Sequence, residues 1–182
     1  EKGDLYYLCA AGVVFLTLVA ANSILRKKNK PTTELLNMLD LVALSTIADV
    51  APLIGFNRDL VRQGLKIMAK RQRIGLTALT DVAKMNNAPT PYHLGYLLGP
   101  RINAGGRVGK ADLGIRLLTC KDYNEANSIA EKLNQLNDER RSIESAVQFQ
   151  ALEQVEKRGT NNTLVWAAGE GWHPGVVGIV AS

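Results

Sequence analysis

Cysteine and aromatic residues are scarce in this 182-residue chain. Its two cysteines, Cys9 and Cys120, stand far apart without a partner motif, which excludes a disulfide framework and a zinc signature and indicates thiols in a reducing compartment. Aromatic residues make up 5% of the chain, so no aromatic platform for stacking single-stranded bases is visible. The first residues also lack the charged and then apolar pattern of a secretory signal peptide.

Neither positive nor negative charge is in strong excess. Lysine and arginine number 22 and aspartate and glutamate 17, which gives a net charge of +5 that is compatible with an anionic partner without requiring one. The 46% hydrophobic content is normal for a chain that buries a core, and the length suits one domain or one and a half small ones. Because the chain begins at Glu1 and ends at Ser182 inside an apolar run, we expect a piece of a longer protein.

The longest stretch without charged side chains, apart from titratable thiol and tyrosine groups, covers residues 5–25. Its length is enough for a membrane span, and the basic triplet at 26–28 fits a cytoplasmic flank. The small, mildly polar residues at 10–12 and 20–23 weaken that interpretation. We therefore predict a helix buried within an α/β domain, and no membrane association.

Residues 99–107 read Gly-Pro-Arg-Ile-Asn-Ala-Gly-Gly-Arg, directly after an apolar run. Glycine permits positive φ and close backbone approach, and Pro100 opposes a simple helical continuation, so we predict a loop here. Arg101 and Arg107 on such a loop suit a phosphate, because each guanidinium offers a planar pair of donors. A basic surface turn is the alternative.

Helical periodicity predicts most other elements. Asp122 with Glu125 forms an approximate capping box and Gly159 is a helix stop, so we predict one helix over 122–158. This helix would be roughly 50 Å long and would connect two lobes; a homodimeric coiled coil is the alternative. A strand at 163–168 would open an α/β lobe. Further helices are predicted at 34–44 (capped by Thr32 or Thr33), 57–70 (capped by Asn57), 75–84, 91–98, 111–118 and 175–182, the last with Pro174 in its first turn.

Three other features are candidates for chemistry. Asp49 lies among apolar residues, where a buried carboxylate would need a pair, a hydrogen bond or a metal ion; a cap or turn is the alternative. His173 precedes a helix start, where backbone N–H groups meet anions. Basic residues recur every four positions along the helix predicted at 57–70 and form a basic stripe: Arg58, Arg62, Lys66 and Lys70. The stripe fits a solvated helix face or, alternatively, a binding surface for a polyanion.

Four segments in this order resemble the single-stranded-DNA exonucleases of the DHH phosphoesterase superfamily. They are LDLVALSTIADVAPL at 39–53, NR at 57–58, GPRINAGGR at 99–107 and GWHPGVVGIVAS at 171–182. Ser45 and Gly105 stand where the family usually has glycine and alanine, and neither change removes a functional group. The resemblance implies an α/β fold with two lobes. Residues 1–119 would be the C-terminal part of a DHH domain, mostly helical here, 120–159 the long connecting helix and 160–182 the beginning of a DHHA1 domain.

The family removes nucleotides from the 5′ end of single-stranded DNA with Mn2+ or Mg2+, in cytoplasmic DNA repair and recombination. The resemblance implies that Asp49 is a catalytic metal ligand and that Arg101, Asn103 and Arg107 hold DNA phosphates, with His173 facing the same cleft. Other metal ligands are expected before Glu1, so we predict that this chain alone is inactive. A single-strand-binding protein or a helicase would be a cellular partner.

Two other functions stay open on the sequence. One is a DHH-family phosphodiesterase for short oligonucleotides or cyclic dinucleotides. The other is a non-catalytic nucleic-acid-binding helical module built on the basic stripe.

Overall fold

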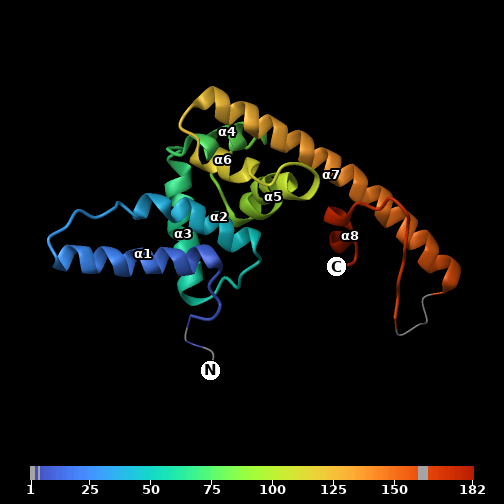
Figure 1. Cartoon of the computed structure of the whole chain (residues 1–182), viewed down its shortest axis with the longest axis horizontal. Helices are drawn as coiled ribbons and strands as arrows, with labels where there is room; N and C mark the ends of the chain where they lie inside the picture. Colours follow the sequence, from blue (N-terminus) through green and yellow to red (C-terminus); the bar gives the residue numbers. More distant parts are fainter. Residues whose placement is uncertain (1–2, 4, 160–163) are drawn as a thin grey trace.

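Helices make up the regular structure in the computed structural model, which describes Gly3 and residues 5–159 and 164–182 (Figure 1). Within that part of the chain no strand is present, so it is mostly helical rather than α/β. The elements are α1 (Ala10–Lys27), the 3-10 helix η1 (Leu36–Met38), α2 (Leu39–Ala48), α3 (Gly55–Ala69), α4 (Ile74–Val82), the π-helix η2 (His93–Leu98), α5 (Gly99–Val108), α6 (Leu113–Thr119), α7 (Tyr123–Arg158) and α8 (Pro174–Val180).

The main core forms where α4, α5 and α6 pack against α7, with α2 and α3 packed on each other beside them. Leucines recur at helical spacing on the faces that meet there. Five of them are completely buried: Leu79, Leu94, Leu98, Leu117 and Leu133. A smaller cluster, which includes Phe15, Leu39 and Leu60, joins one side of α1 to α2 and α3.

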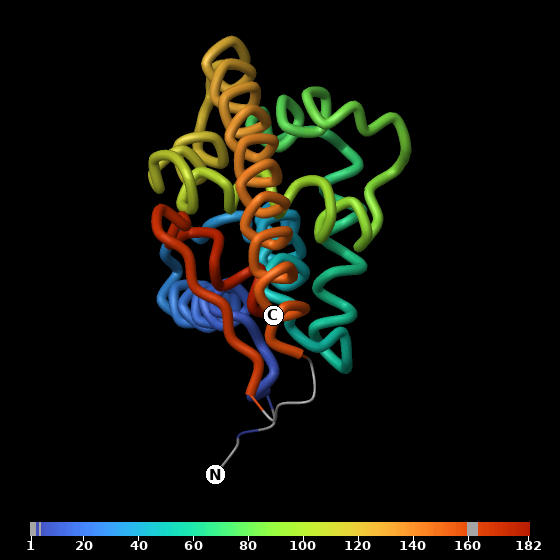
Figure 2. The backbone as a smooth tube through the Cα atoms, turned by 90° about the vertical axis from the view of Figure 1, so that its right-hand side faces the viewer, coloured from blue at the N-terminus to red at the C-terminus, as the bar shows by residue number. Residues whose placement is uncertain are grey.

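Helix α7 follows the sequence prediction to within one residue. The Asp122 side chain accepts a hydrogen bond from the backbone N–H of Glu125 (2.8 Å), and Gly159 ends the helix with φ of 84°. Most of its buried residues lie between Ala126 and Asn137, in the half that packs on the core. Its other half extends away from the core, and the terminal segment runs back beside it (Figure 2).

The strand predicted at 163–168 is wrong in its described part, while Thr163 lies outside the described residues. Residues 164–168 are irregular because α7 side chains take up their backbone groups. Gln154 donates to the carbonyl of Ala168 (2.8 Å) and accepts from its N–H (3.2 Å), and Arg158 donates to the carbonyl of Trp166 (2.9 Å).

Helix α1 is not the buried helix that the sequence predicted. It buries Gly12, Phe15 and Asn22, whereas Val13 and Val14 remain 52% and 57% exposed. Within the described residues, this one helix has the length and apolar composition to cross a membrane, and 17% of that window is buried. Its outer face therefore presents apolar side chains to the solvent.

Two predicted helix caps have other roles. Helix α3 begins at Gly55, and the Asn57 side chain is buried, where it donates to the carbonyls of Tyr7 and Pro52 (both 2.9 Å). Thr33 caps no helix: its backbone N–H and carbonyl pair with the side-chain amide of Asn22 on α1 (3.2 and 2.7 Å). Tertiary hydrogen bonds have overridden both local capping preferences.

Candidate functional site

The segment predicted as a phosphate-binding loop is helical. Residues 91–108 form one continuous helical run, in which η2 passes directly into α5. Within this run Pro100 has no N–H to donate, so it interrupts the helical hydrogen-bond pattern at the junction of η2 and α5. The wider π turn before it, marked by the bond from the Gly99 N–H to the Leu94 carbonyl, relieves the clash that a proline ring makes with the carbonyl four residues back.

Gly99 brings this helical run against the end of α2. A Cβ atom at Gly99 would lie 2.8 Å from the Leu94 carbonyl oxygen and 3.3 Å from the Ala48 Cβ. Asp49 follows Ala48 as the C-cap of α2, so it lies near the start of α5. It is exposed, and Ser45 Oγ donates to its Oδ2 (3.2 Å). The cap alternative therefore describes its local role.

Arg101 is half-buried and faces α7. Its Nε donates to Asn134 Oδ1 on α7 (2.9 Å), and another guanidinium nitrogen donates to the Leu97 carbonyl (2.8 Å). Burial lowers the pKa of the Arg101 guanidinium, Arg141 lowers it further, and Asp138 partly opposes them. With two donors engaged, Arg101 ties α5 to α7 and has fewer donors left for a phosphate.

Asn103 and Arg107 are exposed and lie four residues apart, on one face of α5. Gly106 lies beside them, and a Cβ atom there would meet nothing within 4 Å. Arg107 donates to the backbone carbonyl of Gly175 on α8 (3.0 Å). This face of α5 therefore meets the beginning of α8.

His173 is the N-cap of α8, and its Nδ1 accepts from the Gly175 N–H (3.1 Å). A Cβ atom at Gly175 would lie 2.3 Å from the Arg107 carbonyl oxygen, so only glycine permits this close contact. Arg107 and His173 thus both bond to Gly175, although they come from elements far apart in the sequence.

The predicted site residues fall into two groups. Arg107 and His173 both bond to Gly175 at the α5–α8 contact, and Asn103 lies on the same face of α5 as Arg107. Asp49 lies at the end of α2, and Arg101 is turned toward α7. The described residues contain no group of three or more His, Cys, Asp or Glu side chains that could hold a metal ion. Asp49 alone does not provide the several oxygen ligands that a divalent cation requires.

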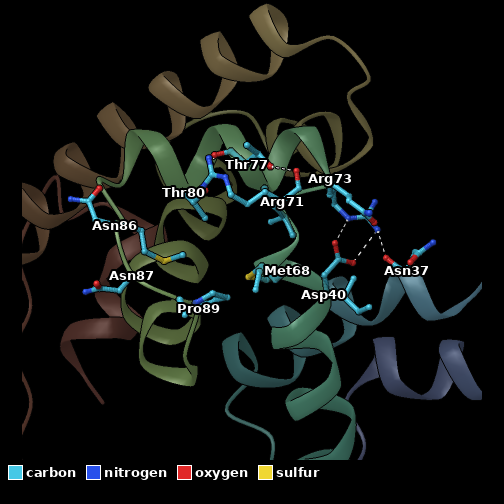
Figure 3. A pocket seen from close by; sticks show the side chains of 16 residues that line it. Asn37, Asp40, Met68, Arg71, Arg73, Thr77, Thr80, Asn86, Asn87 and Pro89 are labelled. Atoms are coloured by element: carbon cyan, nitrogen blue, oxygen red, sulfur yellow. Dashed lines mark hydrogen bonds and ion pairs between the residues drawn. The ribbon is translucent and has the colours of Figure 1, made fainter.

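One buried ion pair escaped the sequence prediction, although Asp40 belongs to the family-like segment 39–53. Asp40 is 3% exposed, and both of its carboxylate oxygens accept from the Arg73 guanidinium (2.7 and 3.0 Å), which also donates to the Asn37 carbonyl (3.1 Å). The pair lines a cavity of about 480 Å³ between α3, α4 and residues 85–89 (Figure 3). Both charges are satisfied by each other, which indicates a structural role.

Comparison with known proteins finds relatives of this chain among curated proteins. No protein-family model matches the chain. It is 39% identical over 187 residues to the single-stranded-DNA-specific exonuclease RecJ of Escherichia coli (strain K12), a match that covers 96% of this chain and 32% of the relative. The RecJ of Dickeya dadantii (strain 3937) is 40% identical over the same coverage.

The fold agrees with that match. The crystal structure of exonuclease RecJ bound to manganese superposes with a TM-score of 0.82 at 33% identity, over 99% of this chain and 44% of that chain. The chain matches a segment of RecJ. RecJ from Thermus thermophilus in complex with Mg2+ gives a TM-score of 0.74 at 33% identity, over 94% of this chain and 26% of that chain. The chain spans 32% of the length of the curated RecJ relatives named above.

Proposed function

We propose that this chain is part of a metal-dependent 5′→3′ exonuclease that hydrolyses phosphodiester bonds of single-stranded DNA in cytoplasmic repair and recombination. The match to RecJ proteins over 96% of the chain carries the proposal. The bonds that Arg107 and His173 both make to Gly175 support it, because two hydrogen-bonding side chains from separate elements at one point suit one phosphate. The other DHH-family phosphodiesterase chemistries have no such support.

The domain assignment is part of this proposal. Residues 1–119 would belong to a DHH domain, 120–159 to the connecting helix, and 160–182 to the beginning of a DHHA1 domain. The packing of α4, α5 and α6 on one half of α7, with the terminal segment beside the other half, supports a boundary along that helix.

Asn103, Arg107 and His173 would hold strand phosphates near the 5′ end, and Arg101 would keep α5 in place while lending charge to the same region. Asp49 would supply one oxygen ligand to Mn2+ or Mg2+, ions that neutralise phosphodiester charge and activate water. The described residues do not fit a complete metal site. We therefore propose that the chain alone is inactive and that the remaining ligands come from other parts of the protein. Single-strand-binding protein or a helicase would be a partner in the cell.

A chimera tests the proposal. The matching segment of Escherichia coli RecJ is replaced by this chain, and release of nucleotides from 5′-phosphorylated single-stranded DNA is measured with and without Mn2+. The chimera should release nucleotides in a metal-dependent manner, and Asp49→Ala should abolish the release. This chain alone should release none. A folded but inactive chimera, or activity that survives Asp49→Ala, would contradict the assignment.

A further inference from the structure

An exposed pair of aromatic rings lies on η2 and the residue before it. Tyr92 and Tyr96 stack with ring centroids 4.9 Å apart and an angle of 29° between the planes. They keep 61% and 65% of their surface exposed. The low aromatic content had predicted no such platform. Large rings left in solvent and already stacked indicate a contact surface.

A groove of about 430 Å³ joins the start of this segment to α3. It is lined by the apolar side chains of Leu53, Val61 and Leu65, by Pro91, and by Arg58 and Arg62. Pro91, which lines the groove with Arg58 and Arg62, immediately precedes Tyr92 in the sequence, so the groove and the tyrosine pair are neighbours.

The basic stripe continues along α3 beyond the groove. Arg58, Arg62, Lys66 and Lys70 are all exposed, and none forms an ion pair with another described residue. Asp59 is the one acidic residue between positions 55 and 70. Successive cations are about 6 Å apart along the helix axis, and each step turns about 40° around it. Such a row of uncompensated charge attracts a polyanion.

The chemistry of the two parts selects one kind of ligand. Phosphates match the guanidinium groups of Arg58 and Arg62, and a flat face is needed against the stacked tyrosines. A base in a duplex has both faces covered by its neighbours. An anionic lipid surface or an acidic peptide would satisfy the charges but offers no ring to stack.

We propose that Arg58, Arg62, Tyr92 and Tyr96, here called the α3–tyrosine surface, bind single-stranded nucleic acid, with phosphates on the arginines and an unpaired base on the tyrosines. This surface uses none of the residues assigned to the candidate site. It adds a second place where the strand is held, and only the choice of DNA as its natural ligand rests on the proposed function.

Fluorescence anisotropy with labelled oligothymidine, in the presence of EDTA to prevent hydrolysis, tests the proposal on the whole chain. Arg58→Ala with Arg62→Ala should weaken binding about tenfold and reduce the slope of log K against log salt by about 1.4, or 0.7 for each phosphate. Tyr92→Ala with Tyr96→Ala should weaken binding about tenfold without changing the slope.

An abasic strand separates stacking from charge. On this strand, the tyrosine double variant should bind as the unchanged chain does, while the arginine variant should still bind more weakly. Tyr92→Phe with Tyr96→Phe keeps the rings and should bind oligothymidine normally, which would show that the rings and not the hydroxyl groups make the contact. Lys27→Ala with Lys28→Ala removes the same charge from exposed residues at the C-terminal end of α1 and serves as the matched control.

The proposal is overturned if both double variants bind within about twofold of the Lys27/Lys28 control, or if that control weakens binding equally. If the variants of the α3–tyrosine surface retain binding while Asn103→Ala with Arg107→Ala loses it, this inference is wrong and the proposed function stands. If the chimera is inactive while the variants of the α3–tyrosine surface bind DNA more weakly, the proposed function is wrong and this inference stands.

Discussion

At the scale of single residues, the end of α2 carries a strained valine next to Asp49. The Val50 N–H bonds to the Ile47 carbonyl (3.1 Å) and the Ala51 N–H to the Thr46 carbonyl (3.0 Å), which is the Schellman pattern. Val50 has φ of 53°, where glycine is usual and a β-branched residue is disfavoured. The turn presents Asp49 at the exposed end of the helix.

Val50→Gly should therefore raise the free energy of unfolding by about 1 kcal/mol, because the left-handed conformation costs glycine nothing sterically. The valine side chain is 87% exposed, so its removal loses little packing. Urea unfolding followed by circular dichroism measures the change. Val50→Ala is the control and should gain less, since alanine keeps a Cβ. A less stable glycine variant would show that Val50 is not left-handed in solution.

Asp40 is the buried residue whose charge matters most for stability. Asp40→Asn should lower the free energy of unfolding by about 2–3 kcal/mol, because it leaves the Arg73 guanidinium partly buried without its counter-ion. The same urea titration applies. Asp81→Asn breaks the exposed Arg71–Asp81 pair and should change stability by less than about 1 kcal/mol. Equal costs for the two variants would contradict a burial-dependent role.

At the scale of elements, the sequence predicts an element well where local signals alone decide it. Helix α7 is right within one residue because its cap, Asp122, and its stop, Gly159, act within a few positions of the helix ends. The loop predicted at 99–107 is wrong because the conformation of Pro100 and the glycines depends on tertiary contacts that the sequence does not reveal. A π turn and the packing of Gly99 on α2 make a helix of it.

That π turn also explains why the residue types of the candidate site could be predicted but not their directions. An extra residue in the turn before Pro100 rotates everything after it by about 100° relative to a regular helix. Arg101 consequently points to Asn134 on α7, while Arg107 points to α8. Tyr92 and Tyr96 lie four residues apart, so any helix over 91–98 brings their rings together, and composition alone did not reveal this.

The α5–α8 contact rests on one glycine. Gly175→Ala should push α8 away from α5, because the added Cβ would lie 2.3 Å from the Arg107 carbonyl oxygen. Amide hydrogen exchange of α8 should accelerate about tenfold, as overpacking costs about 1–3 kcal/mol. Gly178→Ala is a matched control in the same helix, since its Cβ would meet nothing within 4 Å. Unchanged exchange in Gly175→Ala would show that the contact does not form in solution.

At the scale of the whole molecule, burial is uneven. The core of α2 to α7 is well packed, whereas α1 has an apolar outer face and the far half of α7 exposes Phe149 and Leu152. The sequence could not reveal this, because residues 5–25 have the composition of a buried helix whatever covers them. An isolated chain with such faces must either associate or leave apolar surface in water.

We therefore expect this chain to self-associate without detergent, with a weight-average mass in sedimentation equilibrium that rises with concentration. Val14→Gln with Leu18→Gln, two exposed positions one turn apart on α1, should reduce the association about tenfold, since each change removes apolar area from the contact. Thr17→Gln alters the same helix at a polar exposed position and should leave the self-association unchanged. A monomeric chain would show that the α1 face does not drive association, and a chain soluble only in detergent would favour the membrane interpretation of residues 5–25 that we rejected.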